Sequence, residues 1–210
     1  EGFRRQRRAE PVGPIGTENI ARFISDDPAR LPHGYGGGFG GASLLGTLIG
    51  ELLARGHTVA AFTISSDLPI SPCAEVVAQG NRFRIHYCPV RPHSFRPKFG
   101  KLGRAVDAYR FERAGLRHAM LAEGLDLVHA HWAYEFALAA IASGLPHVIT
   151  CHDVPRNVLR YMPNPYRLVR YFMARRVMVT ARTLTAVSPY LRDAIAGSAR
   201  VPITVIANPL

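Results

Sequence analysis

Short apolar runs alternate along this chain with longer runs in which apolar residues recur at helical spacing. The apolar run at residues 58–64 (TVAAFTI), for example, follows residues 43–55, where leucine and isoleucine recur every three or four positions. Strands that alternate with helices build parallel sheets, because each helix returns the chain to the same edge. Several short runs are apolar at consecutive positions, as expected when helices cover both faces. The pattern predicts an α/β fold with a doubly wound parallel sheet in a single Rossmann-like domain.

The same pattern locates the expected elements. We expect strands over residues 20–25, 58–64, 83–88, 126–131, 147–151, 183–187 and 203–206. We expect helices over residues 43–55, 104–123, 134–143, 166–181 and 190–196. Residues 1–18 are basic and contain proline and glycine, and we expect them to form a flexible leader. The domain then covers residues 19–210, and 210 residues suffice for one hydrophobic core.

The net charge of the chain indicates which binding partners to expect, and its cysteines and apolar runs indicate the cellular compartment. Lysine and arginine number 26 against 15 acidic residues, a formal net charge of +11. This excess favours an anionic partner such as nucleic acid, a phosphorylated small molecule or an acidic membrane surface. Three cysteines without a C-x-x-C pair predict reduced thiols. No run reaches the roughly 18 apolar residues of a membrane span, and no apolar segment follows the basic start, so we expect a cytoplasmic protein.

A glycine-rich segment precedes the helix expected at residue 43. Residues 33–41 read HGYGGGFGG, and glycines ahead of a helix let the backbone approach an anionic ligand closely. We expect the segment to bind a phosphate or carboxylate group. The alternative is that it is only a flexible connector between a strand and a helix. Gly36, Gly38 and Gly41 also spell G-x-G-x-x-G. A dinucleotide site fits poorly, because residues 26–32 separate this segment from its strand and the next strand ends without an acid.

Histidines gather where two neighbouring strands are expected to end. His129 and His131 lie two residues apart on one strand face, and His152 with Asp153 ends the next strand. These four residues form a candidate metal set, but their spacing matches no metal motif, and we expect no metal. His129 fits better as a hydrogen-bonded histidine inside the sheet. His152 is better placed to donate to a phosphate oxygen or to act as an acid or base.

Several blocks along the chain resemble a known family when taken in order. They are GGASLLGTLIGELLARGHTV (residues 40–59), DLVHAH (126–131), TCHD (150–153), TAVS (185–188) and VIANP (205–209). Together they resemble the N-terminal, acceptor-side domain of GT-B glycosyltransferases of the family-4 type, over residues 20–210. Pro209 departs from the family's glycine after Asn208, which affects the local shape of a linker. The resemblance implies one of two Rossmann-like domains, and we expect the chain to end where the interdomain linker begins.

The resemblance also implies an activity. Such enzymes move a sugar from a nucleotide-sugar donor to a glycan or lipid-linked acceptor, with retention of configuration and without a metal or other cofactor. By position, Gly40 and Gly41 would lie against the donor diphosphate, and His152 would be the catalytic-site contact to the sugar or acceptor. Acceptor-side residues would be His131, Trp132, Tyr134, Asp153 and Arg156, with Ser188 behind them. The remaining chemistry belongs to the second domain, so this chain alone should be inactive.

Arginines interleave with aromatic residues in two segments, residues 91–117 and 156–182. This pattern favours docking of the domain on the anionic inner face of a membrane, and a solvated basic face is the alternative. A different interpretation is a basic α/β module that binds nucleic acid or another polyanion through residues 4–8. The chain lacks a recognition helix or RNA-binding motif, so we do not expect nucleic acid. A third interpretation is that the chain belongs to a GT-B relative that catalyses another reaction, such as a sugar-nucleotide epimerase.

Overall fold

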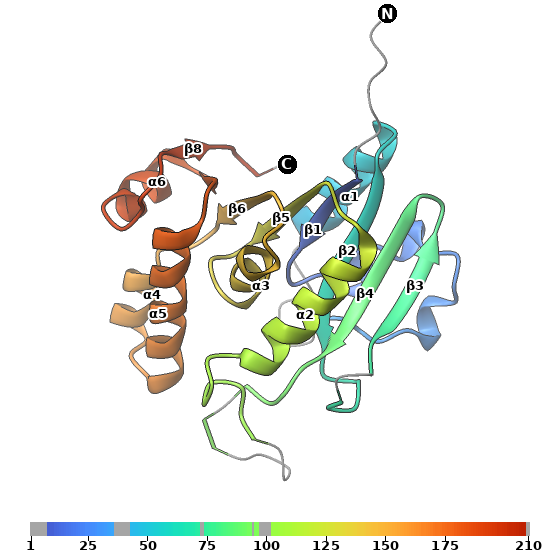
Figure 1. Cartoon of the computed structure of the whole chain (residues 1–210), viewed down its shortest axis with the longest axis horizontal. Coiled ribbons are helices and arrows are strands. Elements are labelled where there is room, and N and C mark those ends of the chain that lie inside the picture. The colour runs from blue at the N-terminus through green and yellow to red at the C-terminus, as the bar shows by residue number, and fades with distance from the viewer. Residues whose placement is uncertain (1–7, 36–42, 72–73, 94, 97–101, 209–210) are drawn as a thin grey trace, which may run out of the picture.

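A computed structural model describes residues 8–35, 43–71, 74–93, 95–96 and 102–208, and within them one sheet crosses the molecule (Figure 1). Its strands are β1 (Arg8–Val12), β2 (Thr58–Ser65), β3 (Val76–Gly80), β4 (Phe83–Pro89), β5 (Leu127–His131), β6 (His147–Cys151), β7 (Leu184–Ala186) and β8 (Ile203–Val205). The order is β3-β4-β2-β1-β5-β6-β7-β8. Among these described strands, β3 alone pairs antiparallel, with β4, and the other neighbours pair parallel. The predicted doubly wound parallel sheet is confirmed.

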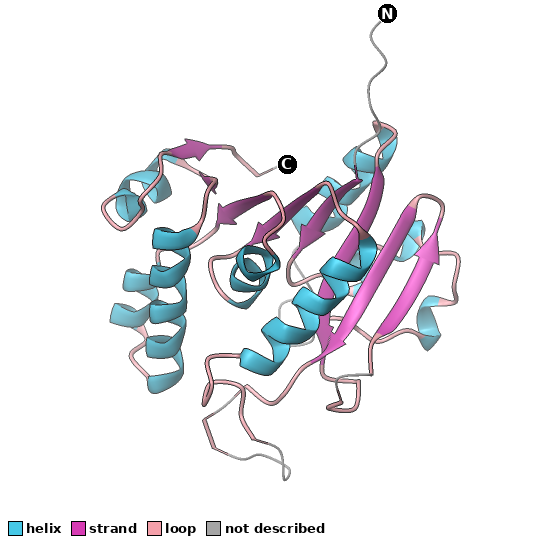
Figure 2. Ribbon diagram, viewed as in Figure 1, coloured by secondary structure: helices cyan, strands magenta, loops and turns pink. Residues whose placement is uncertain are grey.

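Helices cover both faces of the sheet (Figure 2). They are α1 (Ser43–Ala54), α2 (Arg110–Glu123), α3 (Glu135–Ser143), α4 (Pro155–Tyr161), α5 (Pro165–Thr180) and α6 (Pro189–Ala196). On one face, buried residues of α2, α3 and α5, such as Leu116, Phe136 and Val177, form a hydrophobic core cluster. On the other face, Leu45 and Ile49 of α1 belong to a separate cluster. Two cores on opposite faces explain why most strands are apolar at consecutive positions.

The prediction that residues 1–18 form a flexible leader is wrong for residues 8–18. β1 lies in the middle of the sheet, paired with β2 and β5, and Val12 is fully buried. The 3₁₀ helix η1 (Thr17–Asn19) follows, with Thr17 buried. The short sequence RAEPV carries two charges and a proline, so its strand pairing comes from neighbours distant in sequence rather than from local propensity. Residues 1–7 lie outside the described residues.

The strand expected at residues 20–25 is also wrong. This segment contains the 3₁₀ helix η2 (Ala21–Phe23), preceded by the fully buried Ile20. The Phe23 ring packs edge-on against Phe83 of β4 with 5.9 Å between centroids. Ile20 is therefore buried, and Phe23 and Ile24 are partly buried, without strand pairing, because they pack against the cluster on the α1 side of the sheet. A third 3₁₀ helix, η3 (Pro28–Arg30), follows.

Three further differences concern β3, α4 and the start of α2. β3 and α4 were not predicted. The helix expected from residue 104 begins at Arg110, because Ala108 and Tyr109 have positive φ angles of 52° and 64° that interrupt a right-handed helix. Two further expectations can be compared with the structure. Cys88 and Cys151 are free and buried.

Within the described residues, no helix is long and apolar enough to cross a membrane.

Candidate functional site

Three aromatic side chains meet where β5 and β6 end. His131 Nδ1 lies 3.0 Å from His152 Nε2, a hydrogen-bond distance. The Trp132 ring stacks on the His152 ring, with 4.2 Å between centroids and 24° between planes. Trp132 adopts a positive φ of 63° while its backbone N–H donates to the Thr150 carbonyl at 3.0 Å. Such a conformation costs energy for a bulky residue, so the fold holds the indole against His152 at some expense.

His129 points into the sheet instead. Its Nε2 lies 2.7 Å from the Thr150 hydroxyl, which in turn lies 2.7 Å from the Thr185 hydroxyl on β7. The prediction of a hydrogen-bonded histidine inside the sheet is confirmed. Among the described residues, no group of three or more His, Cys, Asp or Glu side chains is arranged to hold a metal ion.

Burial keeps all three imidazoles uncharged near neutral pH. It lowers the pKa of His129 to about 4, and burial with the nearby His129 lowers the pKa of His152 to about 4. The pKa of His131 is held well below 6.5 by burial first and by its two imidazole neighbours second. His131 and His152 therefore share one proton between their facing nitrogens. Nε2 of His131 is buried without a partner among the described residues.

A second group of polar side chains lies next to this one. The Tyr134 hydroxyl donates to Asp153 Oδ2 at 2.8 Å. The Arg170 guanidinium lies 3.6 Å from the centre of the Tyr134 ring, and its Nη1 lies 3.6 Å from Oε2 of the buried Glu135. Burial raises the pKa of Asp153, although the Tyr134 hydrogen bond opposes the shift. Burial alone would lower the pKa of Arg170, but the Glu135 charge together with the nearby Tyr109, Tyr134 and Tyr35 outweighs burial and raises that pKa.

A cavity of about 500 Å³ joins these side chains to the start of α1. Its lining residues are Pro14, Tyr35, Ser43, Leu44, Trp132, Tyr134, Glu135, Phe136, Asp153 and Arg170. The first residues of α1 and the ends of β5 and β6 thus converge on one cavity, which His152 approaches through its stacked partner Trp132. A site at the carboxyl ends of parallel strands is the expected place for a ligand in this kind of sheet.

Residues 40–210 match the sequence model of Glycosyltransferase Family 4. The chain belongs to this family. The match begins just before α1 and includes every strand from β2 to β8. It confirms the resemblance carried by the blocks from residue 40 onward. A comparison with curated proteins found no match.

The structure brings together only part of the site expected for this family 4 domain. Trp132, Tyr134 and Asp153 line the cavity, and His131 and His152 lie behind Trp132. Arg156 is exposed on α4 and lines a separate hollow beside Tyr171 and Ser198, so its acceptor contact stays a prediction. The Ser188 hydroxyl caps α6 by accepting from the Leu191 N–H at 3.2 Å. Gly36, Gly38, Gly40 and Gly41 lie outside the described residues.

Sequence reasoning missed Tyr35, Glu135 and Arg170. Glu135 carried a usable signal, because it is the one charged residue in the otherwise apolar helix EFALAAIAS and must find a partner when buried. Arg170 had been grouped with a basic surface. Its guanidinium instead lies inside the domain, against Glu135 and the Tyr134 ring.

Proposed function

We propose that this chain is the N-terminal, acceptor-side half of a retaining, metal-independent glycosyltransferase that moves a hexosyl group from a nucleotide sugar to an acceptor. The observation that carries the proposal is the cavity in which the start of α1 meets Trp132 and Asp153. Membership of glycosyltransferase family 4 supports sugar transfer as the reaction. A second domain would close over this cavity and supply the rest of the donor site.

The donor diphosphate would lie at the α1 end of the cavity. Free backbone N–H groups and the helix dipole make the N-terminus of a 12-residue helix a favourable place for negative charge. Ser43 begins that helix and lines the cavity, and Gly40 and Gly41 precede it in the sequence. As the sugar leaves, negative charge grows on the diphosphate, and fixed donors in a dehydrated cleft stabilise it. Such donors remove the need for a metal in this proposal.

His152 would position a hydroxyl of the transferred sugar or of the acceptor. Its pKa of about 4 makes it a neutral imidazole, and Nε2 is occupied by His131. Nδ1 makes no hydrogen bond to any described residue, and in this proposal it would be the atom that contacts the ligand. Trp132 holds the ring plane by stacking, which fixes the direction of that bond.

Product analysis on the complete protein tests the proposal. We would incubate it with nucleotide sugars, with and without candidate acceptors, and identify the products by NMR and mass spectrometry. Transfer of the sugar with its anomeric configuration retained, and unaffected by a chelator, supports the proposal. An epimerised sugar nucleotide would assign the chain to a relative with other chemistry. Binding of random nucleic acid with a steep salt dependence and no turnover would favour the polyanion-binding module.

The α4–α5 hairpin supports a lipid-linked acceptor at an anionic membrane surface. Tyr161, Met162 and Phe172 are 76%, 55% and 57% exposed, and the same hairpin carries the exposed arginines Arg160, Arg175 and Arg176. Aromatic and apolar side chains beside cations are typical of surfaces that insert into an anionic headgroup layer.

Co-sedimentation with vesicles tests this surface. Binding should be stronger to phosphatidylglycerol vesicles than to phosphatidylcholine vesicles, and Tyr161→Ser should weaken it. Tyr190→Ser is the matched control, since Tyr190 is 70% exposed on α6. Equal sedimentation with both lipids would remove the membrane from the proposal.

A further inference from the structure

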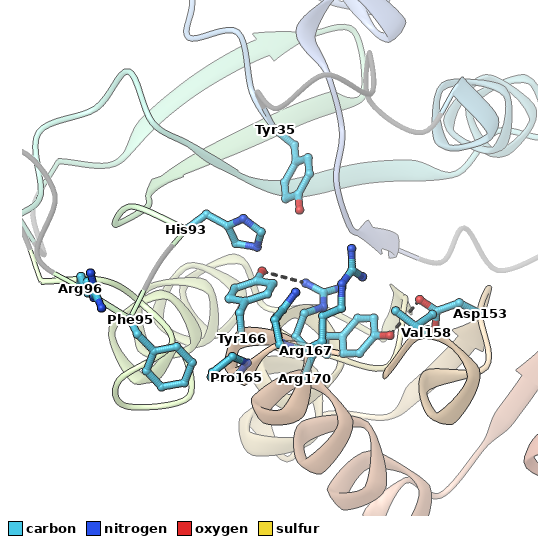
Figure 3. A pocket seen from close by; sticks show the side chains of 12 residues that line it. Tyr35, His93, Phe95, Arg96, Asp153, Val158, Pro165, Tyr166, Arg167 and Arg170 are labelled. Atoms are coloured by element: carbon cyan, nitrogen blue, oxygen red, sulfur yellow. Dashed lines mark hydrogen bonds between the residues drawn. The ribbon is translucent and has the colours of Figure 1, made fainter. Parts of the chain in front are cut away.

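A second cavity, of about 650 Å³, adjoins the first and shares Tyr35, Tyr134, Asp153 and Arg170 with it (Figure 3). Its other walls come from the segment after β4 and from the beginning of α5. They include His93, Phe95, Arg96, Asn164, Tyr166 and Arg167. Figure 3 shows the Tyr35 hydroxyl directed toward Arg170, with His93 above Tyr166. The volume suits a group the size of a phosphorylated sugar.

The arginines that line this second cavity or lie behind its lining carry more positive charge than the nearby carboxylates can balance. Arg170 is paired with Glu135. Arg167, on the first turn of α5, has a buried Nε without a hydrogen-bond partner. Arg104 is only 7% exposed, and its Nε is also buried and unpartnered. No carboxylate among the described residues forms an ion pair with Arg104 or Arg167. Neither guanidinium is therefore neutralised by a direct ion pair, and the interactions that remain are the hydrogen bond of Arg104 to Tyr35 and the longer-range attraction between Arg167 and Asp153.

His93 shows that these charges act on one region of the cavity. Its ring meets Tyr166 edge-on with 3.6 Å between centroids. The pKa of His93 is lowered by partial burial first, and then by the charges of Arg104, Arg170 and Arg167 in that order. Three guanidinium groups thus raise the electrostatic potential around one imidazole. Asp153, the acid that lines the cavity, accepts a hydrogen bond from Tyr134.

Leaving the buried Arg104 and the half-buried Arg167 without an ion pair costs stability, because the lost hydration of each charge is not replaced by a counter-ion. An anionic ligand removes that cost. Two guanidinium groups without a direct ion pair suit a phosphate monoester, which carries about −1.5 to −2 at neutral pH, better than a carboxylate. Guanidinium groups bind phosphate oxygens through paired hydrogen bonds. The N-terminus of the 16-residue helix α5, capped by Asn164, adds a favourable dipole at the same wall.

We propose that the cavity between His93, Tyr166 and Arg167 binds a phosphate monoester, and that this group belongs to the acceptor. The second part rests on the function proposed above, since the acceptor must reach the adjoining cavity where transfer would occur. The shared wall of Tyr35, Tyr134 and Arg170 lets one molecule occupy both cavities.

Calorimetric titration of the 210-residue chain with inorganic phosphate tests the binding site, with acetate at the same ionic strength as the comparison. Phosphate should bind with saturation and more tightly than acetate. R167M should weaken phosphate binding at least about tenfold, as expected for a lost charged hydrogen bond. R176M, at an exposed arginine on the same helix, is the matched control and should bind like the wild type. Equal weakening in both variants, or equal binding of acetate, would overturn the site.

Arg104 supplies an independent check that also measures folding. R104M should lower phosphate affinity at least about tenfold while its melting temperature without phosphate stays close to that of the wild type, because methionine keeps the packing on the Tyr109 ring and removes a buried charge that has no ion pair. R104K should retain most of the affinity. Loss of folding in R104M with phosphate binding intact in R167M would contradict the proposal.

Competition experiments identify the source of the phosphate and separate this inference from the proposed function. Glucose 6-phosphate that displaces inorganic phosphate points to a soluble acceptor. Displacement by vesicles of phosphatidic acid in phosphatidylcholine, but not by phosphatidylcholine alone, points to a lipid. Sugar transfer by the complete protein at an unchanged rate and KM in R167M would overturn the acceptor assignment and leave the proposed function standing. Phosphate binding without any sugar transfer would overturn the proposed function and with it the acceptor assignment, and would leave the phosphate site standing.

Discussion

His131 and His152 are joined by a 3.0 Å contact between Nδ1 and Nε2 although 21 positions separate them in the chain. The register of the sheet explains it. His131 of β5 lies opposite Thr150 of β6, and His152 follows Thr150 by two residues, on the same face. A slip of one residue between β5 and β6 would send one imidazole to the opposite face. The contact therefore reports the register of the strands that build the cavity.

Replacing His152 by alanine should lower the turnover of the complete enzyme at least about a hundredfold, the usual effect of removing one fixed hydrogen-bond donor from a charge-stabilising site. Circular dichroism and thermal unfolding should show an intact fold. His118→Ala, at an exposed histidine on α2, is the control and should leave turnover unchanged. Turnover near the wild-type value in His152→Ala would give that histidine a structural role only.

Acidification should destabilise the domain through its buried histidines. The folded pKa of His129 and of His152 is about 4, below the unfolded value of 6.5. A lowered folded pKa means that the unfolded chain binds more protons, so this stability is complete above pH 6.5 and is lost as the pH falls toward 4. Each such group contributes up to about 1.4 kcal/mol per pH unit in that interval.

Urea unfolding at several pH values between 6.5 and 5 measures this loss. His129→Gln keeps a polar partner for Thr150 and removes one titrating group, so its unfolding free energy should fall less steeply with acid than that of the wild type. Parallel curves for the two proteins would show that His129 titrates normally in the folded state.

The buried pair of Glu135 and Arg170 should be sensitive to the loss of one partner alone. Arg170→Met leaves the Glu135 carboxylate without its cation and should cost about 3 kcal/mol of unfolding free energy. The double variant Arg170→Met with Glu135→Gln should recover most of that loss. Arg192→Met, which breaks an exposed pair with Asp193, should cause no measurable change. A double variant as unstable as Arg170→Met would mean that the guanidinium acts through packing.

Gly80 should tolerate no side chain, because a Cβ there would overlap the carbonyl oxygen of Phe23. Gly80→Ala must displace η2 from β3 and should lower the unfolding free energy by about 2 kcal/mol or more. Gly197→Ala is the control: a Cβ there meets nothing within 4 Å and φ is −65°, so stability should stay equal or rise slightly. Equal stability of the two variants would show that η2 is not held against the sheet.

The candidate site was only partly visible before the fold was known. The histidines at the ends of β5 and β6 were predicted to lie together because side chains alternate along a strand and parallel strands end at the same edge. Arg104 and Arg170 were grouped with a basic surface instead, because charge patterns along a chain do not reveal which residues are buried. Tyr35 had no signal at all, since it follows an irregular segment and reaches the cavity through the path of the backbone.

The alternation of apolar runs was enough to determine the α/β class, the helix α1 and the strands β2 and β4 to β8. A strand that is buried on both faces of a parallel sheet consists of consecutive apolar residues, and this pattern can be recognised in the sequence of the strand itself. The tertiary structure alone decided that residues 8–12 form the central strand and that residues 20–25 cap the sheet as 3₁₀ turns. The physical reason is that pairing with β2 and β5, and contact with Gly80, involve residues distant in sequence. Those contacts outweigh local preferences and leave no periodic pattern in the segments they organise.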